Sequence, residues 1–164
     1  IDVFGNRITN ARLIIYGKGS EQDLKYYMGL INNTVNPSNI EVHEFLPYPE
    51  HFRMRSKWHV GIMLYENISL NYSYCAPNKL YEYTMLGLPI LCSNQPHLRR
   101  IVEDQGIGIS VNPRKTEQID FGVRWFLNNN LVTLGKKSRD WFLINGNYEK
   151  YFQEFLKLCY DIQG

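Results

Sequence analysis

The sequence predicts an α/β fold, a Rossmann-like parallel sheet with helices on both faces. Short apolar runs alternate with amphipathic segments along the chain, and glycine, proline or asparagine separates most of them. Strands that alternate with helices across short links pair in parallel and bury both faces of their sheet. A length of 164 residues fits one domain that builds its core without disulfides or metals. We therefore expect residues 1–164 to form a single domain.

The first half of the chain predicts three strands. Residues 13–16 are a compact apolar run that ends at a glycine, which is typical of a buried parallel strand. Residues 40–45 alternate as a second strand, and a short helix over 50–58 leads into a third strand, 59–64. Ser20 is placed to cap the helix that follows the first strand. That helix should bury its apolar residues, which are Leu24, Met28, Leu30 and Ile31.

The second half begins with a long polar loop, residues 65–77, and long loops in compact domains are usually functional or mobile. The expected strands after it are residues 89–92 and 107–111. The expected helices are residues 78–86, 98–103, 117–127, 131–144 and 148–162. The last helix carries an apolar stripe, which we expect either to pack on its own sheet or to be exposed for an absent partner: Tyr148, Tyr151, Phe152, Phe155, Cys159 and Ile162.

Composition excludes several classes of protein. The net charge of +2 is too small to indicate binding of nucleic acid. The three cysteines are widely spaced and lack a CxxC pair, which argues against zinc and a disulfide framework and favours a cytoplasmic location. No apolar run reaches the roughly 20 residues that span a bilayer.

The most informative segment is residues 76–90, A-P-N-K-L-Y-E-Y-T-M-L-G-L-P-I. It predicts a short helix that Gly87 ends. Asn78, Lys79 and Glu82 share one face at the start of that helix. Free backbone N–H groups and the positive end of the helix dipole suit a phosphate group. A carboxylate one turn further on suits the paired hydroxyls of a ribose. The segment therefore indicates a site for a nucleotide diphosphate.

This segment closely resembles the donor-site signature of group 1 glycosyltransferases, which have the GT-B fold. Residues 11–19 and 56–64 resemble two further segments of that family in the expected order. The resemblance implies that the chain is the C-terminal, donor-binding half of such an enzyme, without its N-terminal acceptor-binding domain. It implies transfer of a sugar from a nucleotide diphosphate to a hydroxyl acceptor in polysaccharide or glycolipid synthesis. Retention of configuration, no metal and no further cofactor are implied as well.

The same resemblance implies roles for individual residues. Glu82 would hold the ribose, while Lys79 and the backbone amides of residues 78–80 would contact the diphosphate. Gly17 and Gly19 would form a tight turn beside the nucleotide; Gln22 stands where a dinucleotide site needs a third glycine, which excludes NAD. The residues expected to bind substrate are Gly17, Gly19, Tyr48, Tyr74, Asn78, Lys79, Leu80 and Glu82.

Simpler interpretations stand beside these roles. Glu82 could pair with Lys79 on an exposed face, Asn78 could act only as the N-cap, and Tyr48 could pack locally instead of stacking on a base. Tyr74 occupies a position where the family often has a glutamate that contacts the donor sugar. A catalytic residue is not identified.

Two other functions remain open. One is a nucleotide-sugar epimerase of the same fold, which needs acid–base residues that the chain does not convincingly supply. The other is a non-catalytic nucleotide-binding or scaffold module. For the transferase, a membrane-surface glycolipid is a candidate acceptor, with the enzyme peripheral to the inner face of the membrane. The isolated chain is expected to be inactive.

Overall fold

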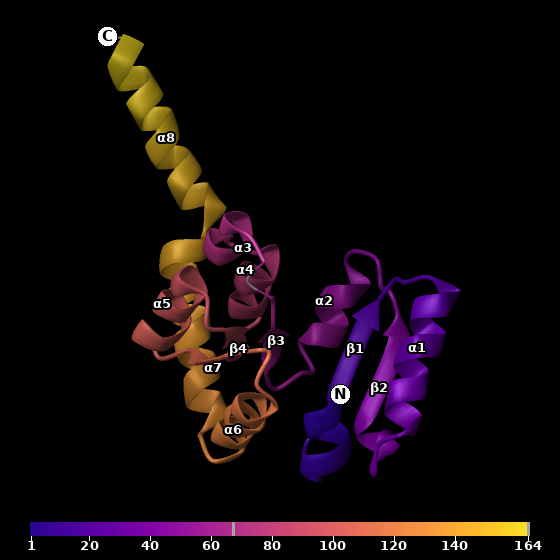
Figure 1. Ribbon diagram of the computed structural model, residues 1–164. Coiled ribbons are helices and arrows are strands. Elements are labelled where there is room, and N and C mark those ends of the chain that lie inside the picture. The colour runs from indigo at the N-terminus through magenta and orange to yellow at the C-terminus, as the bar shows by residue number, and fades with distance from the viewer. Residues whose placement is uncertain (67, 164) are drawn as a thin grey trace. The chain divides into compact units, whose positions relative to one another are not determined.

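The computed structural model describes residues 1–66 and 68–163, with the backbone alone at 162 and 163. The chain forms two compact units (Figure 1). Unit 1 contains residues 1–57 and 111–129, and unit 2 contains residues 58–110 and 130 onward. Each unit has its own parallel strand pair, so the five expected strands are present in two sheets where the sequence suggested one. The α/β class and the parallel pairing agree with the prediction.

Unit 1 is built on a two-stranded parallel sheet. Leu13 lies opposite Ile40, and the register continues to Gly17 opposite Glu44. Arg12 and Glu41 form an ion pair of 2.8 Å beside this sheet. The elements of the unit are a π-helical turn η1 (Val3–Arg7), β1 (Leu13–Gly17), α1 (Glu21–Asn32), a 3-10 turn η2 (Pro37–Asn39), β2 (Ile40–Glu44), α2 (Glu50–Arg55) and α6 (Thr116–Leu127).

Helix α1 starts where the sequence predicts. Ser20 accepts a hydrogen bond from the Asp23 N–H at 3.1 Å, and the Asp23 carboxylate accepts one from the Ser20 N–H at 3.0 Å. This capping box satisfies two backbone groups at the helix start. The predicted burial of its apolar face is wrong except at Ile31, because Leu24, Met28 and Leu30 are exposed. Apolar periodicity identifies the apolar side of a helix, but it does not identify what covers that side.

Unit 2 is built on a three-stranded sheet in the order β3-β4-β5. Strands β3 and β4 are parallel, with Gly61 opposite Ile90. Every residue of β4 is buried, so both faces of this central strand are covered, as expected for a parallel sheet. The elements are β3 (Gly61–Met63), α3 (Leu70–Tyr74), α4 (Asn78–Met85), β4 (Ile90–Ser93), α5 (Pro96–Asp104), β5 (Gly108–Val111), α7 (Leu131–Trp141), a π-helical segment η3 (Phe142–Gly146) and α8 (Tyr148–Gln163).

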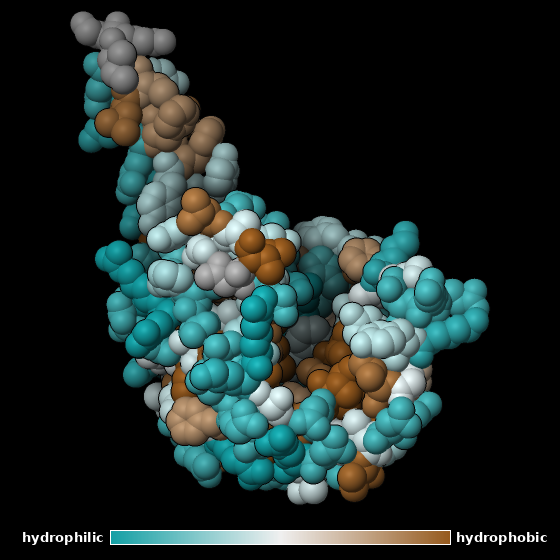
Figure 2. Space-filling model, in the orientation of Figure 1, coloured by the Kyte–Doolittle hydropathy of each residue, from teal (hydrophilic) through white to brown (hydrophobic). Residues whose placement is uncertain are grey.

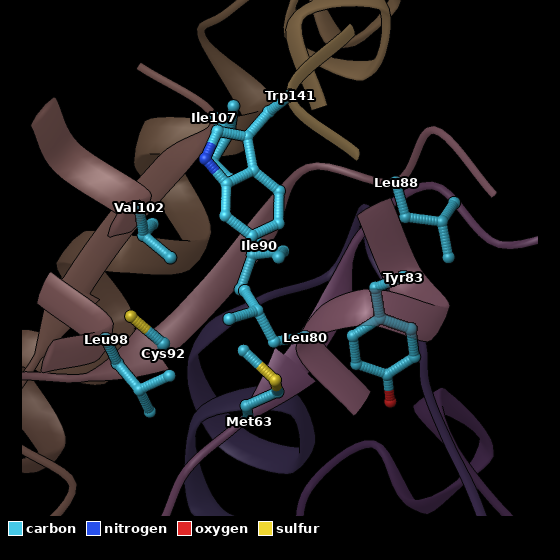
Figure 3. Close-up of a cluster of buried hydrophobic side chains, with 10 residues drawn as sticks. All are labelled: Met63, Leu80, Tyr83, Leu88, Ile90, Cys92, Leu98, Val102, Ile107 and Trp141. Carbon is cyan, nitrogen blue, oxygen red and sulfur yellow. The ribbon is translucent and has the colours of Figure 1, made fainter. Parts of the chain in front are cut away.

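The core of unit 2 joins the sheet to three helices (Figure 3). Met63 of β3 and Ile90 of β4 meet Leu80 of α4, and all three are almost completely buried. The other members of this cluster are Tyr83, Leu88, Cys92, Leu98, Val102, Ile107 and Trp141. Burial raises the pKa of the Cys92 thiol to about 12, with a smaller effect from Glu103, so Cys92 is an inert packing residue. The cluster fixes α4 and α5 against the sheet.

Helix α8 extends away from the remainder of unit 2 (Figure 1). Figure 2 shows brown residues on the surface of this helix. Its exposed large apolar side chains are Tyr148, Tyr151, Phe152, Phe155, Leu158 and Tyr160. The expectation that this stripe packs on its own sheet is therefore wrong for Tyr148, Tyr151, Phe152 and Phe155, which are exposed, whereas Cys159 is partly buried. The side chain of Ile162 lies outside the described part of the chain. No helix in the described ranges is long and apolar enough to cross a membrane.

Candidate functional site

Helix α4 has the two ends that its sequence predicts. Pro77 is the N-cap residue, with extended backbone at φ −69° and ψ 142°. Gly87 has φ 69°, a left-handed conformation that glycine adopts without strain. The Gly87 N–H donates to the Thr84 carbonyl at 3.0 Å, and the Leu88 N–H donates to the Tyr83 carbonyl at 2.9 Å. This Schellman pair ends the helix and leads the chain into β4.

The first turn of α4 presents polar groups to solvent. Asn78 and Lys79 are exposed and stand at the first two helical positions, where an α-helix leaves N–H groups without intrahelical acceptors. The third amide differs from expectation, because the Leu80 N–H donates to the Pro77 carbonyl at 2.9 Å. Asn78 is also not the N-cap, since Pro77 takes that position. The backbone amides of Asn78 and Lys79 and the Lys79 ammonium group are therefore the groups in this turn that could bind an anion.

Glu82 lies one turn further along α4 and is half-buried. The charge of the Glu82 carboxylate affects the pKa of the Tyr65 phenol. Burial raises the pKa of Tyr65, and the neighbouring Cys75 and the Glu82 carboxylate raise it further. Helix α4 leads directly into the start of β4, so its first turns, with Glu82, lie toward the carboxyl edge of the sheet. Ligands of parallel α/β sheets bind at that edge.

Ser93 joins the ends of β3 and β4 at the same edge. Its hydroxyl accepts a hydrogen bond from the Tyr65 N–H and donates one to the Met63 carbonyl at 3.3 Å. Ser93 is almost completely buried. Ser93 is not among the residues predicted from the sequence, although a serine that ends a run of buried apolar residues is a usable signal. The contact fixes the direction in which the loop leaves β3 toward α4.

Tyr74 is the last residue of helix α3, which lies within the predicted loop of residues 65–77. Ser69 caps this helix by accepting a hydrogen bond from the Tyr72 N–H at 3.4 Å, and Ser73 donates to the Ser69 carbonyl at 3.1 Å. Tyr74 is 66% exposed. Cys75, between Tyr74 and the α4 segment, is partly buried. Tyr74, Asn78, Lys79, Leu80 and Glu82 thus all belong to the segment between β3 and β4.

The remaining predicted residues belong to unit 1. Gly17 is the last residue of β1 and is exposed, and a side chain added there would meet no atom within 4 Å. Gly19 precedes the N-cap of α1 and is also exposed. Tyr48 is 77% exposed, and its ring lies 5.7 Å from that of Phe52 at 87°. The structure therefore brings Gly17 and Gly19 together at one strand end and shows local packing for one edge of Tyr48.

No group of three or more histidine, cysteine, aspartate or glutamate side chains that could hold a metal ion occurs in residues 1–66 and 68–163. The first turns of α4 and the residues before it offer backbone amides, one ammonium group, one carboxylate and tyrosine hydroxyls. Such groups bind anions and sugar hydroxyls by charge and hydrogen bonds.

Two solved structures share this fold. WaaG, a glycosyltransferase involved in lipopolysaccharide biosynthesis, is 16% identical with a TM-score of 0.59 over 80% of this chain. AviGT4, a glycosyltransferase involved in avilamycin A biosynthesis, is 15% identical with a TM-score of 0.55 over 83% of this chain. The chain spans 34% of WaaG and 44% of AviGT4. No curated protein matches it.

The family model that describes glycosyl transferases of group 1 matches residues 2–142. The match includes both units and the whole segment from β3 to β4. Together with the α/β architecture shared with two glycosyltransferase structures, it confirms the resemblance that residues 76–90 carry. The chain belongs to the group 1 glycosyltransferase family.

Proposed function

We propose that this chain is the donor-binding domain of a glycosyltransferase and binds a nucleotide-diphosphate sugar. The observation that carries the proposal is the first turn of α4. Asn78 and Lys79 are exposed there, and the half-buried Glu82 follows one turn later at the carboxyl edge of the sheet. Membership of the family and the shared fold support a transferase. The acceptor-binding domain would lie outside these 164 residues.

In this proposal the first turn of α4 stabilises the leaving diphosphate. The amides of Asn78 and Lys79, the helix dipole and the Lys79 ammonium group oppose the negative charge that develops as the sugar departs. The Glu82 carboxylate accepts hydrogen bonds from the two ribose hydroxyls. Gly17, Gly19 and Tyr48 belong to unit 1, and their contact with the nucleotide stays a prediction from the sequence. The donor is the substrate, and we propose no metal or further cofactor.

Two further parts of the proposal concern the stereochemistry of the reaction and the identity of the acceptor. We propose that the reaction retains anomeric configuration and that the acceptor hydroxyl belongs to a polysaccharide or glycolipid. WaaG is described as acting in lipopolysaccharide biosynthesis, which supports a lipid-linked acceptor at the inner membrane surface. In that setting the protein would be cytoplasmic and peripheral to the membrane. The hydroxyl of Tyr74 would take the place of a sugar-binding carboxylate.

Glu82→Ala is expected to weaken nucleotide binding by about 1–3 kcal/mol, the usual cost of removing hydrogen bonds to a charged group. Calorimetric titration with UDP, GDP and their hexose conjugates measures the change. Glu154→Ala, which removes an exposed carboxylate from α8, is the matched control and should leave affinity unchanged. Equal affinities in the two variants would contradict the role of Glu82. A wild-type chain that binds no nucleotide would contradict the proposal as a whole.

The isolated chain is expected to bind its donor weakly and to transfer no sugar. The proposed donor site supplies charge stabilisation but no identified acid or base, and the acceptor would be held by residues outside the chain. Incubation with a radiolabelled nucleotide sugar and a panel of glycan and glycolipid acceptors measures transfer directly. Turnover above the rate without protein would show that these 164 residues already contain the acceptor site.

A further inference from the structure

One buried amide in unit 2 has no partner. Gln95 follows β4 by two residues and is the N-cap residue of α5, where its carbonyl accepts a hydrogen bond from the Arg99 N–H at 2.8 Å. The residue is 2% exposed, and both polar atoms of its side chain are buried. Neither Oε1 nor Nε2 has a hydrogen-bond partner among the residues that the structure describes.

A glutamine in this position is costly unless something binds it. Buried polar groups are nearly always hydrogen-bonded, and an unmade bond leaves the cost of removing the amide from water. A leucine of similar size would fill the same space without that cost. Gln95 offers a donor and an acceptor side by side, and a hydroxyl group also donates and accepts. The amide is therefore matched to a hydroxyl.

Gln95 lies at the same edge of the sheet as the proposed donor site. The chain reaches it directly from Ser93, whose hydroxyl binds the main chain of Met63 and Tyr65. The charge of Glu82 in turn raises the pKa of the Tyr65 phenol. Helices α4 and α5 both begin at this carboxyl edge, because α4 leads directly into the start of β4 and α5 directly follows the end of β4. The unpartnered side-chain amide of Gln95 therefore lies at the N-terminus of α5.

We infer that Gln95 binds a hydroxyl group of the sugar that the donor carries, and so contributes to selection of that sugar; this inference rests on the proposed function. Glu82 accounts for the ribose and the α4 amides for the diphosphate, so the sugar is the remaining part of the donor with hydroxyl groups. The amide is closed from solvent in the donor-free chain. A sugar reaches it when a neighbouring segment moves, and we assign that movement to α3, a helix of five residues that packs against α5.

The test compares nucleotide diphosphates with their sugar conjugates. Gln95→Leu removes the amide at similar volume. Gln105→Leu, at the exposed C-terminal end of the same helix, is the matched control. Calorimetry with UDP, GDP and a panel of UDP- and GDP-hexoses gives the ratio of affinities with and without sugar. We expect Gln95→Leu to lower this ratio about tenfold, the factor for one hydrogen bond of average strength, and to leave affinity for the diphosphate unchanged.

Two readouts can overturn the inference separately from the proposed function. An unchanged ratio, with diphosphate binding intact, would show that Gln95 does not contact the sugar. A melting temperature well below that of Gln105→Leu would show that the amide is satisfied within the protein, because loss of an unpartnered amide should leave stability equal or higher. Absence of any nucleotide binding by the wild-type chain would instead overturn the proposed function, and this inference with it.

Discussion

Gly108→Ala is expected to destabilise unit 2 by about 3 kcal/mol or more, at the upper end of the cost of overpacking. A methyl group at Gly108 would overlap the carbonyl oxygen of Ile90 and lie 2.8 Å from its carbonyl carbon. Ile90 cannot move aside easily, since it is a buried residue of the central strand and its N–H donates to the Ile107 carbonyl at 3.0 Å. Urea denaturation followed by tryptophan fluorescence measures the loss, because Trp58 and Trp141 pack in the core of this unit.

Gly29→Ala is the control for the same substitution without a clash. A methyl group at Gly29 would meet no atom within 4 Å, and the residue lies inside α1. Alanine at a helix interior is favoured over glycine, so this variant should gain about 0.5–1 kcal/mol. Equal midpoints for the two variants would show that β4 and β5 are not in the close contact that the structure describes.

The strands were predictable because each is either a short apolar run between turn residues or, in β2, an alternation of apolar and polar residues. All five expected runs are strands, and the run at residues 89–92 is buried on both faces as β4. Helix α3 was not predictable in the same way, since its sequence L-N-Y-S-Y has no apolar period and its start depends on a single cap at Ser69. The division into two sheets was also missed, because alternation of strands and helices does not determine which strands share a sheet.

In the candidate site, too, the features set by neighbouring residues were predictable and the contacts between distant residues were not. The ends of α4 follow from Pro77 and Gly87, both within ten residues of each other, and local rules were sufficient to place them. The link from Ser93 to Tyr65 joins residues 28 positions apart, and no local pattern marks it. Gln95 is polar and adjacent to a proline, which reads as an exposed turn until the burial of its side chain is known.

Leu80→Ala is expected to cost unit 2 about 3 kcal/mol, within the usual range for a buried leucine. Leu80 is 0% exposed and packs in the cluster with Met63 and Ile90, so the smaller side chain leaves a cavity between α4 and the sheet. The same residue lies in the first turn that we propose binds the diphosphate. Its side chain holds that turn against the sheet, and we therefore expect weaker nucleotide binding as well as lower stability. Urea denaturation and calorimetry on one preparation measure both quantities.

Leu158→Ala is the control that separates the effect of losing a buried side chain from the effect of replacing any leucine by alanine. Leu158 is 61% exposed on α8, so its removal should change stability by less than about 0.5 kcal/mol. The comparison with Glu82→Ala then distinguishes the two roles within α4, because Glu82→Ala should lower affinity at nearly unchanged stability. If Leu80→Ala cost no more than Leu158→Ala, α4 would not be fixed by this core. Its first turn would then lack the rigid support that a preorganised anion site requires.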